Sequence, residues 1–454
     1  MKSIASPRPS APSGYLVIGG AAVVTAVGLS ALGALAGDRR LMLLPFGAVI
    51  ALGLVALALV RFELFAALVL LARASLDATK LSSSSLDTTG AVSLLFIVMS
   101  AVWLLREHRR AAAEPSPTSG LVPPLAALFA VALLSAVLSE HPLASATEAV
   151  RLGALPVIVV ALGRVLRDDR HLRLLLAATL ASAVLPLLVA GFQVLTGEGA
   201  LVRTGVSRIQ GTFQHPNPFA AYLGLVLVLA VAVRTHVRGA PKLLLTGLAV
   251  ACAGALVLTY ARGAWLGTVL ALLVVGILQD RRILWVLAAG LVVVLVAVPS
   301  VGARLADLSQ TVAPSGAPGN SLVWRFTYWR EVLDLQTDPV LGIGLRGVQL
   351  SEEASQLPHN DPIRVYVELG LLGSAGYVWL LVAMAREARA ALRRAPPGLP
   401  HGLAVAFAAA YASILLQMLA ANIVTQLVIL WYFMAIAALA MAASRHGERA
   451  PAAA

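Results

Sequence analysis

Several arginines in this sequence stand beside long apolar runs, where a positive charge needs a partner. Arg262 lies in the short turn Thr259–Trp265 between two such runs. A guanidinium at the edge of a bilayer is costly unless it is solvated or paired, and its planar fork suits a phosphate group. Together with Arg208 and Arg325, Arg262 would form a cationic mouth for a diphosphate. The simpler alternative is that Arg262 only extends its side chain to the membrane surface.

A histidine that could act on a proton lies in the segment Pro358–Pro362. His359 is followed by Asn360, then by nine further residues, and then by the pair Gly370 and Gly373. Glycines have no side chain, so a neighbouring helix can approach them closely. His359 would then stand at the entrance to an apolar helix, where a neutral imidazole can accept a proton near pH 7. The alternative is a structural or merely exposed histidine.

An acid lies inside that same apolar helix. Glu368 is about two turns beyond its start, and a carboxylate inside a membrane helix is a candidate for a functional role. The structural alternative is an ion pair with Arg364, one helical turn earlier.

The polar stretch Arg208–Ala220 leads directly into another apolar run. His215 and Asn217 in this stretch could line a sugar site. The structural alternative is a stiff entry to a helix, made by Pro216 and Pro218.

These residues predict neither a metal site nor a cofactor. The spacing of His215, His359 and Asp361 fits no zinc motif. Cys252 is the only cysteine and lies in an apolar run, so an intramolecular disulfide and a cysteine-rich metal site are both excluded.

The elements that must position these residues are membrane helices. Hydrophobic residues make up 59% of the 454, charged residues only 12%, and the mean hydropathy is +0.87. A soluble protein keeps about 25% charged residues to face water, so most of this surface must face lipid. The net charge of +12 is scattered in short clusters between apolar runs. That pattern is typical of a membrane protein and argues against a nucleic-acid partner.

We therefore predict an all-α polytopic integral membrane protein with 12 to 14 transmembrane helices, since one span needs about 20 apolar residues. The run at 62–75 is either a fourteenth span or a half-buried helix. The other predicted spans lie near 15–36, 41–60, 88–105, 120–138, 147–166, 171–195, 218–234, 241–259, 263–279, 282–300, 363–385, 402–421 and 424–443.

Basic residues sort the loops onto two sides of the membrane. Clusters such as Arg106–Arg110, Arg164–Arg173 and Arg386–Arg394 alternate with loops that are poor in basic residues, so the basic loops are expected in the cytoplasm. An even number of helices places both termini there. The predicted regions are a cytoplasmic tail at 1–14, membrane helices at 15–300, an extracytoplasmic loop at 301–362, membrane helices at 363–443 and a cytoplasmic tail at 444–454.

The loop at 301–362 is expected to carry the chemistry, because long loops are usually functional. Its part rich in Gly, Pro and Ser, Thr311–Asn320, is expected to be mobile. A helix is predicted from Ser321, and it carries both Arg325 and Arg330. One face of that helix is apolar and aromatic, which is typical of a helix in the membrane interface. The residues on this face are Leu322, Phe326, Trp329 and Leu333.

Taken in order, these motifs resemble the O-antigen ligase and O-antigen polymerase superfamily of membrane glycosyltransferases. The resemblance covers roughly residues 200–385, and the stretch Gly211–Ala220 resembles an earlier outer loop of that family. The other matching features are the Arg262-Gly263-Ala264-Trp265 turn, Arg325 followed by Trp329, the sequence Asp338-Pro339-Val340-Leu341-Gly342-Ile343-Gly344, and His359-Asn360 with nine residues before Gly370-x-x-Gly373.

The resemblance implies a GT-C-like helical fold in the bacterial inner (cytoplasmic) membrane, with an extracytoplasmic loop that caps a lipid-facing cavity. Members of the family pass a glycan from a polyprenyl (undecaprenyl) diphosphate carrier to an acceptor hydroxyl, without nucleotide sugar, cofactor or metal. The implied partners are this donor, a glycan or lipid acceptor and membrane lipid. The implied catalytic residues are His359, Arg262 and Arg325, and the implied substrate-binding residues are Arg208, His215, Asn217, Arg330, Asn360 and Glu368.

The acceptor and the class of activity stay open at the level of sequence. A ligase and a polymerase would share these motifs, and polymerase is slightly favoured because nothing marks a site for a protein acceptor. A transporter or lipid-linked glycan flippase should show repeated broken and charged helices near the bilayer midplane, whereas the unusual residues here cluster at the outer face. A peptidoglycan polymerase of the shape, elongation and division type is a third option, but its loop motifs are not found.

Overall fold

The computed structural model describes residues 39–79, 88–110, 119–203, 206–297, 321–352, 354 and 356–449, together with the isolated positions 27, 30, 31 and 35. The predicted segment Thr311–Asn320 therefore lies outside the described residues, as does most of the predicted first span. The chain divides into two compact units, residues 1–65 and 66–454.

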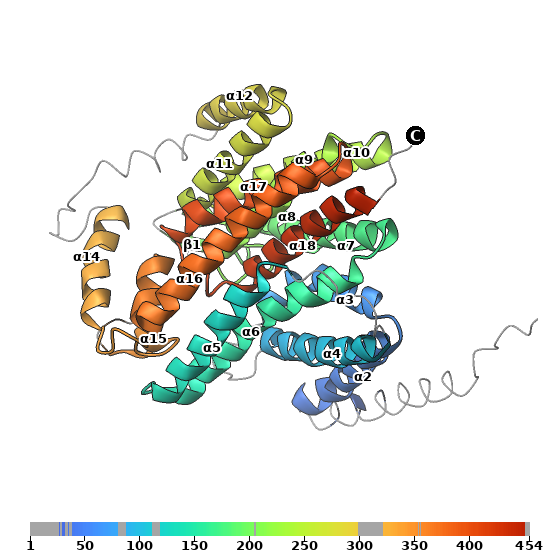
Figure 1. The fold of residues 1–454 in the computed structure, drawn as a ribbon. Coiled ribbons are helices and arrows are strands. Elements are labelled where there is room, and N and C mark those ends of the chain that lie inside the picture. Colours follow the sequence, from blue (N-terminus) through green and yellow to red (C-terminus); the bar gives the residue numbers. More distant parts are fainter. Residues whose placement is uncertain are drawn as a thin grey trace, which may run out of the picture. The chain divides into compact units, whose positions relative to one another are not determined.

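The described chain is helical, as predicted, apart from one small hairpin (Figure 1). The 3₁₀ helix η1 is Ser75–Thr79, and strands β1 (Leu201–Arg203) and β2 (Val206–Arg208) pair antiparallel with Leu201 opposite Arg208. The α-helices are α2 (Arg39–Val60), α3 (Phe62–Arg73), α4 (Thr88–Arg110), α5 (Val122–Leu138), α6 (Pro142–Val165), α7 (Asp169–Ala181), α8 (Val184–Thr196), α9 (Pro216–Arg234), α10 (Ala240–Leu258), α11 (Arg262–Leu278), α12 (Arg282–Ala297), α14 (Ser321–Asp334), α15 (Gly347–Leu350), α16 (Asp361–Arg394), α17 (Leu399–Met418) and α18 (Leu427–Arg449).

These bounds confirm the predicted polytopic, all-α class. Eight helices in the described ranges are long and apolar enough to cross a membrane, and four further apolar helices are shorter. The predicted run at 171–195 is one of these eight candidate spans, Asp169–Thr196, in which a short turn separates α7 from α8. The predicted run at 62–75 ends after the 12 residues of α3. The total of 12 to 14 spans stays a prediction.

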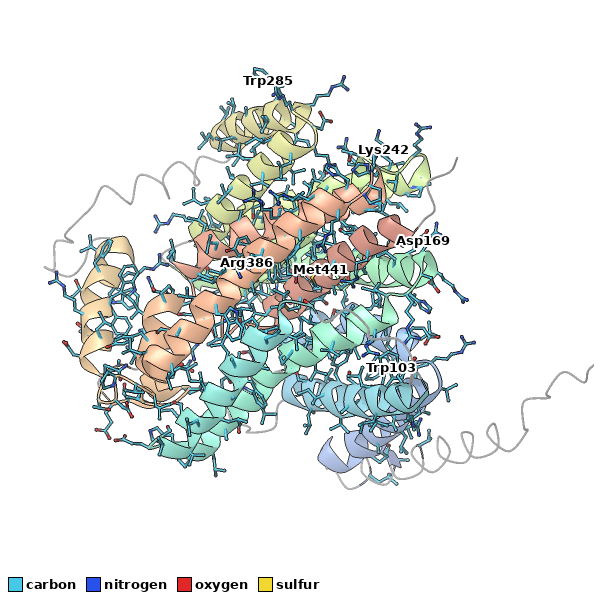
Figure 2. All side chains as sticks on the ribbon, viewed as in Figure 1. Trp103, Asp169, Lys242, Trp285, Arg386 and Met441 are labelled. Carbon is cyan, nitrogen blue, oxygen red and sulfur yellow. The ribbon has the colours of Figure 1, made fainter. Side chains whose placement is uncertain are left out.

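The larger unit is built around α18, which is buried along its length and packs against α6, α9, α16 and α17. Met441 on α18 lies inside the bundle. At the periphery, by contrast, large apolar side chains are exposed. Trp285 on α12 is 78% exposed, and Figure 2 shows its ring directed away from the bundle. Large apolar side chains exposed in this way are expected where a helix faces lipid.

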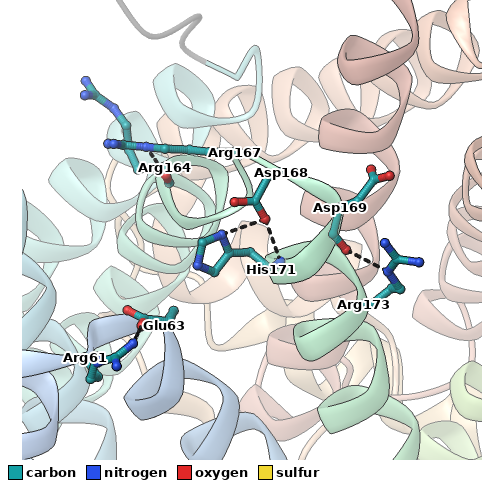
Figure 3. Close-up of polar contacts among 8 residues, drawn as sticks. All are labelled: Arg61, Glu63, Arg164, Arg167, Asp168, Asp169, His171 and Arg173. Carbon is teal, nitrogen blue, oxygen red and sulfur yellow. Dashed lines mark hydrogen bonds and ion pairs between the residues drawn. The ribbon is translucent and has the colours of Figure 1, made fainter. Parts of the chain in front are cut away.

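The junction between α6 and α7 shows how the basic loops are organised. Asp168 caps α7 by accepting a hydrogen bond from the backbone N–H of His171 (2.9 Å), and this bond lowers the pKa of the Asp168 carboxyl. Arg167 forms an ion pair with Glu107 of α4 (2.6 Å). Arg173 donates to the backbone carbonyl of Asp169, as Figure 3 shows. The charges predicted to lie in the cytoplasm are thus held by local helix-end contacts.

Helix α16 is interrupted at Gly370, which has a φ of 63° and a ψ of −160°. These angles lie outside the helical range, so the two halves of α16 do not continue along one axis. The two halves of α16 fold back beside each other, as Figure 1 shows in orange. The span predicted over 363–385 lies within α16, which is a candidate membrane span, but the interruption at Gly370 was not predicted, and a backbone with positive φ at this glycine reverses the chain.

A segment of the long loop fills the interruption. The backbone N–H groups of Ile343 and Gly344 donate to the carbonyls of Val367 and Glu368 (3.0 Å each). In the other direction, Leu371 donates to the carbonyl of Pro339 (2.8 Å). We call this exchange of hydrogen bonds the backbone interlock. It supplies partners to groups that lose their helical partners at the interruption.

Glycines make the interlock possible. A Cβ atom on Gly370 would lie 2.3 Å from the Val340 carbonyl carbon, and one on Gly342 would lie 2.4 Å from the Glu368 carbonyl carbon. The close approach expected at Gly370 therefore occurs, but the approaching segment is the loop backbone and not a neighbouring helix. Serines of α5 and α6 support the same region: Ser135 donates to the carbonyl of Glu368 (3.1 Å) and Ser145 to that of Leu345 (2.7 Å).

Replacing Gly370 with alanine is expected to destabilise the fold strongly. The substitution adds a steric clash to a backbone conformation that alone costs on the order of 1–3 kcal/mol for a residue other than glycine. Gly254→Ala on α10 is the matched control, because no atom lies within 4 Å of its Cβ position. Thermal unfolding of the detergent-solubilised variants should show a lower midpoint for Gly370→Ala only, and equal midpoints would contradict the interlock.

Candidate functional site

Four segments that are distant in sequence converge on one polar region. They are the stretch from β2 into α9, the α10–α11 turn, helix α14, and the residues that precede α16. The contacts described below bring together most of the residues that the sequence singled out.

Arg208 ties the first two segments to each other. It is buried, with its Nε donating to the carbonyl of Thr259 (2.7 Å) and an Nη donating to the Oδ1 of Asn217 (2.8 Å). The backbone N–H of Ile209 also donates to the carbonyl of Leu258 (3.4 Å). Arg208 thus holds the α10–α11 turn, and Arg262 with it, against the start of α9.

His215 is the N-cap of α9. Its Nδ1 accepts a hydrogen bond from the backbone N–H of Asn217 (3.1 Å), so a neutral His215 carries its proton on Nε2. The stiff helix entry suggested by Pro216 is confirmed, since α9 begins there. Because Nδ1 is used in capping, the Nε2–H group of a neutral His215 remains as a hydrogen-bond donor.

Arg262 and Arg325 lie close enough to repel each other. Arg262 is the first residue of α11, so its charge adds to the positive end of the helix dipole. The pKa of Arg325 is lowered, first by burial and then by the charge of Arg262. The Nε of Arg325 is buried and has no hydrogen-bond partner in the described part of the chain. Two cations held together in this way favour binding of an anion between them.

Helix α14 carries Arg325 into the site on a packed face. Tyr328 and Val332 of this face are buried in a cluster with Val367 of α16. The Tyr328 hydroxyl donates to the carbonyl of Gln356 (2.5 Å), and the Trp329 Nε1 donates to the carbonyl of Pro358 (2.7 Å). Helix α14 is thereby fixed beside the residue that precedes His359.

The opposite side of α14 is exposed. Of the apolar face predicted from the sequence, Phe326 is 58% exposed and Leu333 is 40% exposed, whereas Trp329 is half-buried against the carbonyl of Pro358. Arg330 is also exposed, and no contact in the described residues links it to the other site residues.

His359 is neutral and held in an unusual backbone conformation, with a φ of 53°. Its pKa is lowered to about 4, first by burial and then by the charges of Arg325 and His215. Its ring lies edge-on to Trp324, with 6.3 Å between the ring centroids. An uncharged imidazole beside two arginines can accept a proton or a hydrogen bond at neutral pH.

Three consecutive residues attach this segment to the loop between α17 and α18. The Nδ1 of His359 lies 3.1 Å from the Nδ2 of Asn422, the Asn360 Nδ2 donates to the carbonyl of Leu419 (3.3 Å), and the Asp361 carboxylate accepts from the backbone N–H of Val424 (3.1 Å). We call residues 419–424 the clasp loop. Sequence reasoning missed it, because it treated 402–421 and 424–443 as two spans with almost no loop between them.

Two predicted substrate-binding residues have structural partners. Asn360 caps α16 by accepting from the backbone N–H of Ile363 (3.0 Å), so both ends of its amide are used within the protein. Glu368 is buried and pairs with Arg364 (2.8 Å), which is the ion pair offered as the alternative from the sequence. We assign both residues to holding α16 in place.

Comparison with known proteins agrees with this geometry. Residues 247–378 match the family model described as O-Antigen ligase. This segment is similar to the O-antigen ligase domain. The predicted resemblance to the O-antigen ligase and polymerase superfamily is thereby confirmed for this segment, which makes up just under a third of the chain. No curated protein matches the chain significantly.

The O-antigen ligase domain contains much of the site. Arg262, Arg325 and His359 lie within the matched residues, as does the backbone interlock at Gly370. The stretch from Arg208 to Asn217 and the clasp loop lie outside it. The match covers less than half of the chain, and the site described above combines the matched segment with flanking segments.

Proposed function

We propose that this protein transfers a glycan from a polyprenyl diphosphate carrier to an acceptor hydroxyl on the extracytoplasmic face of the bacterial inner membrane. The observation that carries the proposal is the pair of mutually repelling arginines, Arg262 and Arg325, beside the neutral His359. A leaving diphosphate needs positive charge, and an acceptor hydroxyl needs a base. This site offers both within the O-antigen ligase domain.

The proposed reaction is a single displacement at the anomeric carbon of the donor. The acceptor oxygen forms a bond to that carbon while the bond from the carbon to the diphosphate oxygen breaks. The electron pair of the broken bond stays on the diphosphate, and the proton of the acceptor hydroxyl passes to His359. Release of that proton to water returns the imidazole to its neutral form.

The arginines supply the charge that the leaving group needs. Arg262 and Arg325 are held in position before the donor arrives, so they stabilise the developing negative charge without reorganisation. This assignment requires no metal, and EDTA should leave transfer unchanged. Arg208 holds the α10–α11 turn, and His215 and Asn217 lie where they could contact the sugar. Arg330, exposed on α14, is proposed to meet the more distant parts of the glycan.

The location of the site can be tested by cysteine labelling of intact cells. Glu352 and Pro397 are both exposed and lie on opposite sides of the membrane in the predicted topology. In a Cys252→Ala background, a cysteine at 352 should react with an impermeant maleimide, whereas one at 397 should react only after the cells are opened. The reverse pattern would place the site in the cytoplasm and refute the proposal.

Alanine at Arg262 or Arg325 should slow transfer by an amount equivalent to about 2–4 kcal/mol, by analogy with removal of one preorganised donor from an oxyanion hole. Lysine should restore only part of the activity, because it lacks the bidentate fork. The assay is in vitro transfer from a purified lipid-linked glycan, and Arg281→Ala on the predicted cytoplasmic side is the control. Full activity of Arg262→Ala would remove that arginine from the site.

His359→Ala should insert and fold but lose transfer by roughly 10²–10⁴-fold, the usual contribution of acid–base catalysis. Binding of the donor should persist, because the arginines remain. Product ladders or acceptor masses report the transfer, and thermal unfolding reports the fold. Turnover near that of the wild type would exclude His359 as the base and reduce the family match to a shared fold.

A further inference from the structure

We propose that Asn422 is the positioning residue of His359: its side-chain oxygen accepts a hydrogen bond from Nδ1–H and so leaves Nε2 unprotonated toward the acceptor. This inference rests on the proposed function, in which His359 takes the acceptor proton. It assigns a role to the clasp loop, a segment outside the O-antigen ligase match.

The geometry singles out Asn422 as the neighbour that selects the tautomer. The His359 Nδ1 and a terminal amide atom of Asn422 are 3.1 Å apart, and Asn422 is only 6% exposed. No described residue forms a hydrogen bond with Nε2, and the ring is half-buried. Asn422 is therefore the described side chain that can determine which ring nitrogen carries the proton.

Hydrogen bonds hold the clasp loop, and with it the side-chain amide of Asn422, in place. Asn360 and Asp361 attach the loop on either side of Asn422, at Leu419 and Val424. The Thr425 hydroxyl donates to the backbone carbonyl of Asn422 (2.8 Å). An amide anchored in this way orients the imidazole at little entropic cost during the reaction.

The chemistry of the base selects one of the two orientations of the amide. An amide oxygen that faces Nδ1–H leaves a lone pair on Nε2, so the acceptor proton can pass to Nε2 while the new imidazolium keeps its bond to Asn422. An amide NH₂ that faces Nδ1 would put the proton on Nε2, and the ring could then only donate. The structure places the Nδ2 of Asn422 on Nδ1 and leaves its Oδ1 buried without a partner among the described residues. Rotating the amide exchanges oxygen and nitrogen, so the choice between the two orientations rests on the chemistry of the base.

Ring nitrogen resonances test the tautomer without any assay of activity. The full-length protein, labelled with ¹⁵N in its histidine rings and placed in lipid nanodiscs, should show a protonated Nδ1 and an unprotonated Nε2 for His359 at pH 7. The resonance is assigned by its loss in His359→Gln. A protonated Nε2 would overturn the proposal, whatever the fate of the proposed reaction.

Substitutions at Asn422 test the consequence for transfer. Asn422→Asp keeps an acceptor and cannot donate while ionised, so it should retain activity within about tenfold of the wild type. Its negative charge opposes those of Arg325 and His215 at the imidazole and should move the acidic limb of the kcat profile to higher pH. Asn422→Ala should lower kcat on the order of 10–100-fold, as loss of a residue that orients a histidine does elsewhere, with KM for the donor little changed. Thr147→Ala on α6, whose hydroxyl donates only to the carbonyl of Leu143 in its own helix, is the control and should leave the profile in place.

The outcomes separate this inference from the proposed function. If Asn422→Asp is inactive while Asn422→Ala is active, the amide donates to Nδ1 and the proposal is wrong. A kcat and pH profile in Asn422→Ala equal to those of the wild type would make the contact merely structural. If His359→Ala transfers glycan normally, the proposed function fails, and the ring resonances still decide the tautomer.

Discussion

The architecture of the site depends on the backbone interlock at Gly370. An interrupted helix leaves carbonyl and N–H groups without helical partners, and inside a membrane protein such groups cost several kcal/mol each. Here the loop backbone from Pro339 to Gly344 supplies the missing partners on both sides of the interruption. The same exchange fixes the loop, so α14 and the residues before α16 are held in one arrangement. The loop supplies hydrogen-bond partners to the interrupted helix, and the helix in turn holds the loop in place.

This constraint helps to explain how charged residues are assembled in one place. The Trp329 contact with the carbonyl of Pro358 and the buried cluster around Tyr328 bring Arg325 next to His359. On the other side, Arg208 holds the turn that presents Arg262. Packing and hydrogen bonds around Arg262 and Arg325 therefore offset the repulsion between the two charges. Enzymes commonly bear such electrostatic cost in a preorganised site.

The sequence predicted most of the helices, because apolar runs and charged turns are local patterns. Apolar runs separated by charged turns located α9, α10 and α11 to within a few residues. What it could not predict depends on contacts between distant segments. Gly370 looks like a helix-packing glycine from its spacing, and only its contact with Val340 shows that it reverses the chain. Asn422 is a single polar residue between two apolar runs, and only its distance to His359 marks it.

The low pKa of His359 connects these parts. Burial, the charge of Arg325 and the neighbouring His215 make the free imidazole a weak base, which at first sight is a poor choice for taking a proton. In the proposed reaction, however, a diphosphate bound between Arg262 and Arg325 would offset their charge, and an opposite charge nearby raises the pKa of an imidazole. His359 would become a better base only when the donor is in place. The arginines would then have two roles: they would stabilise the leaving group, and they would keep His359 a weak base until the donor binds. Activation of the acceptor would therefore follow binding of the donor through electrostatics alone.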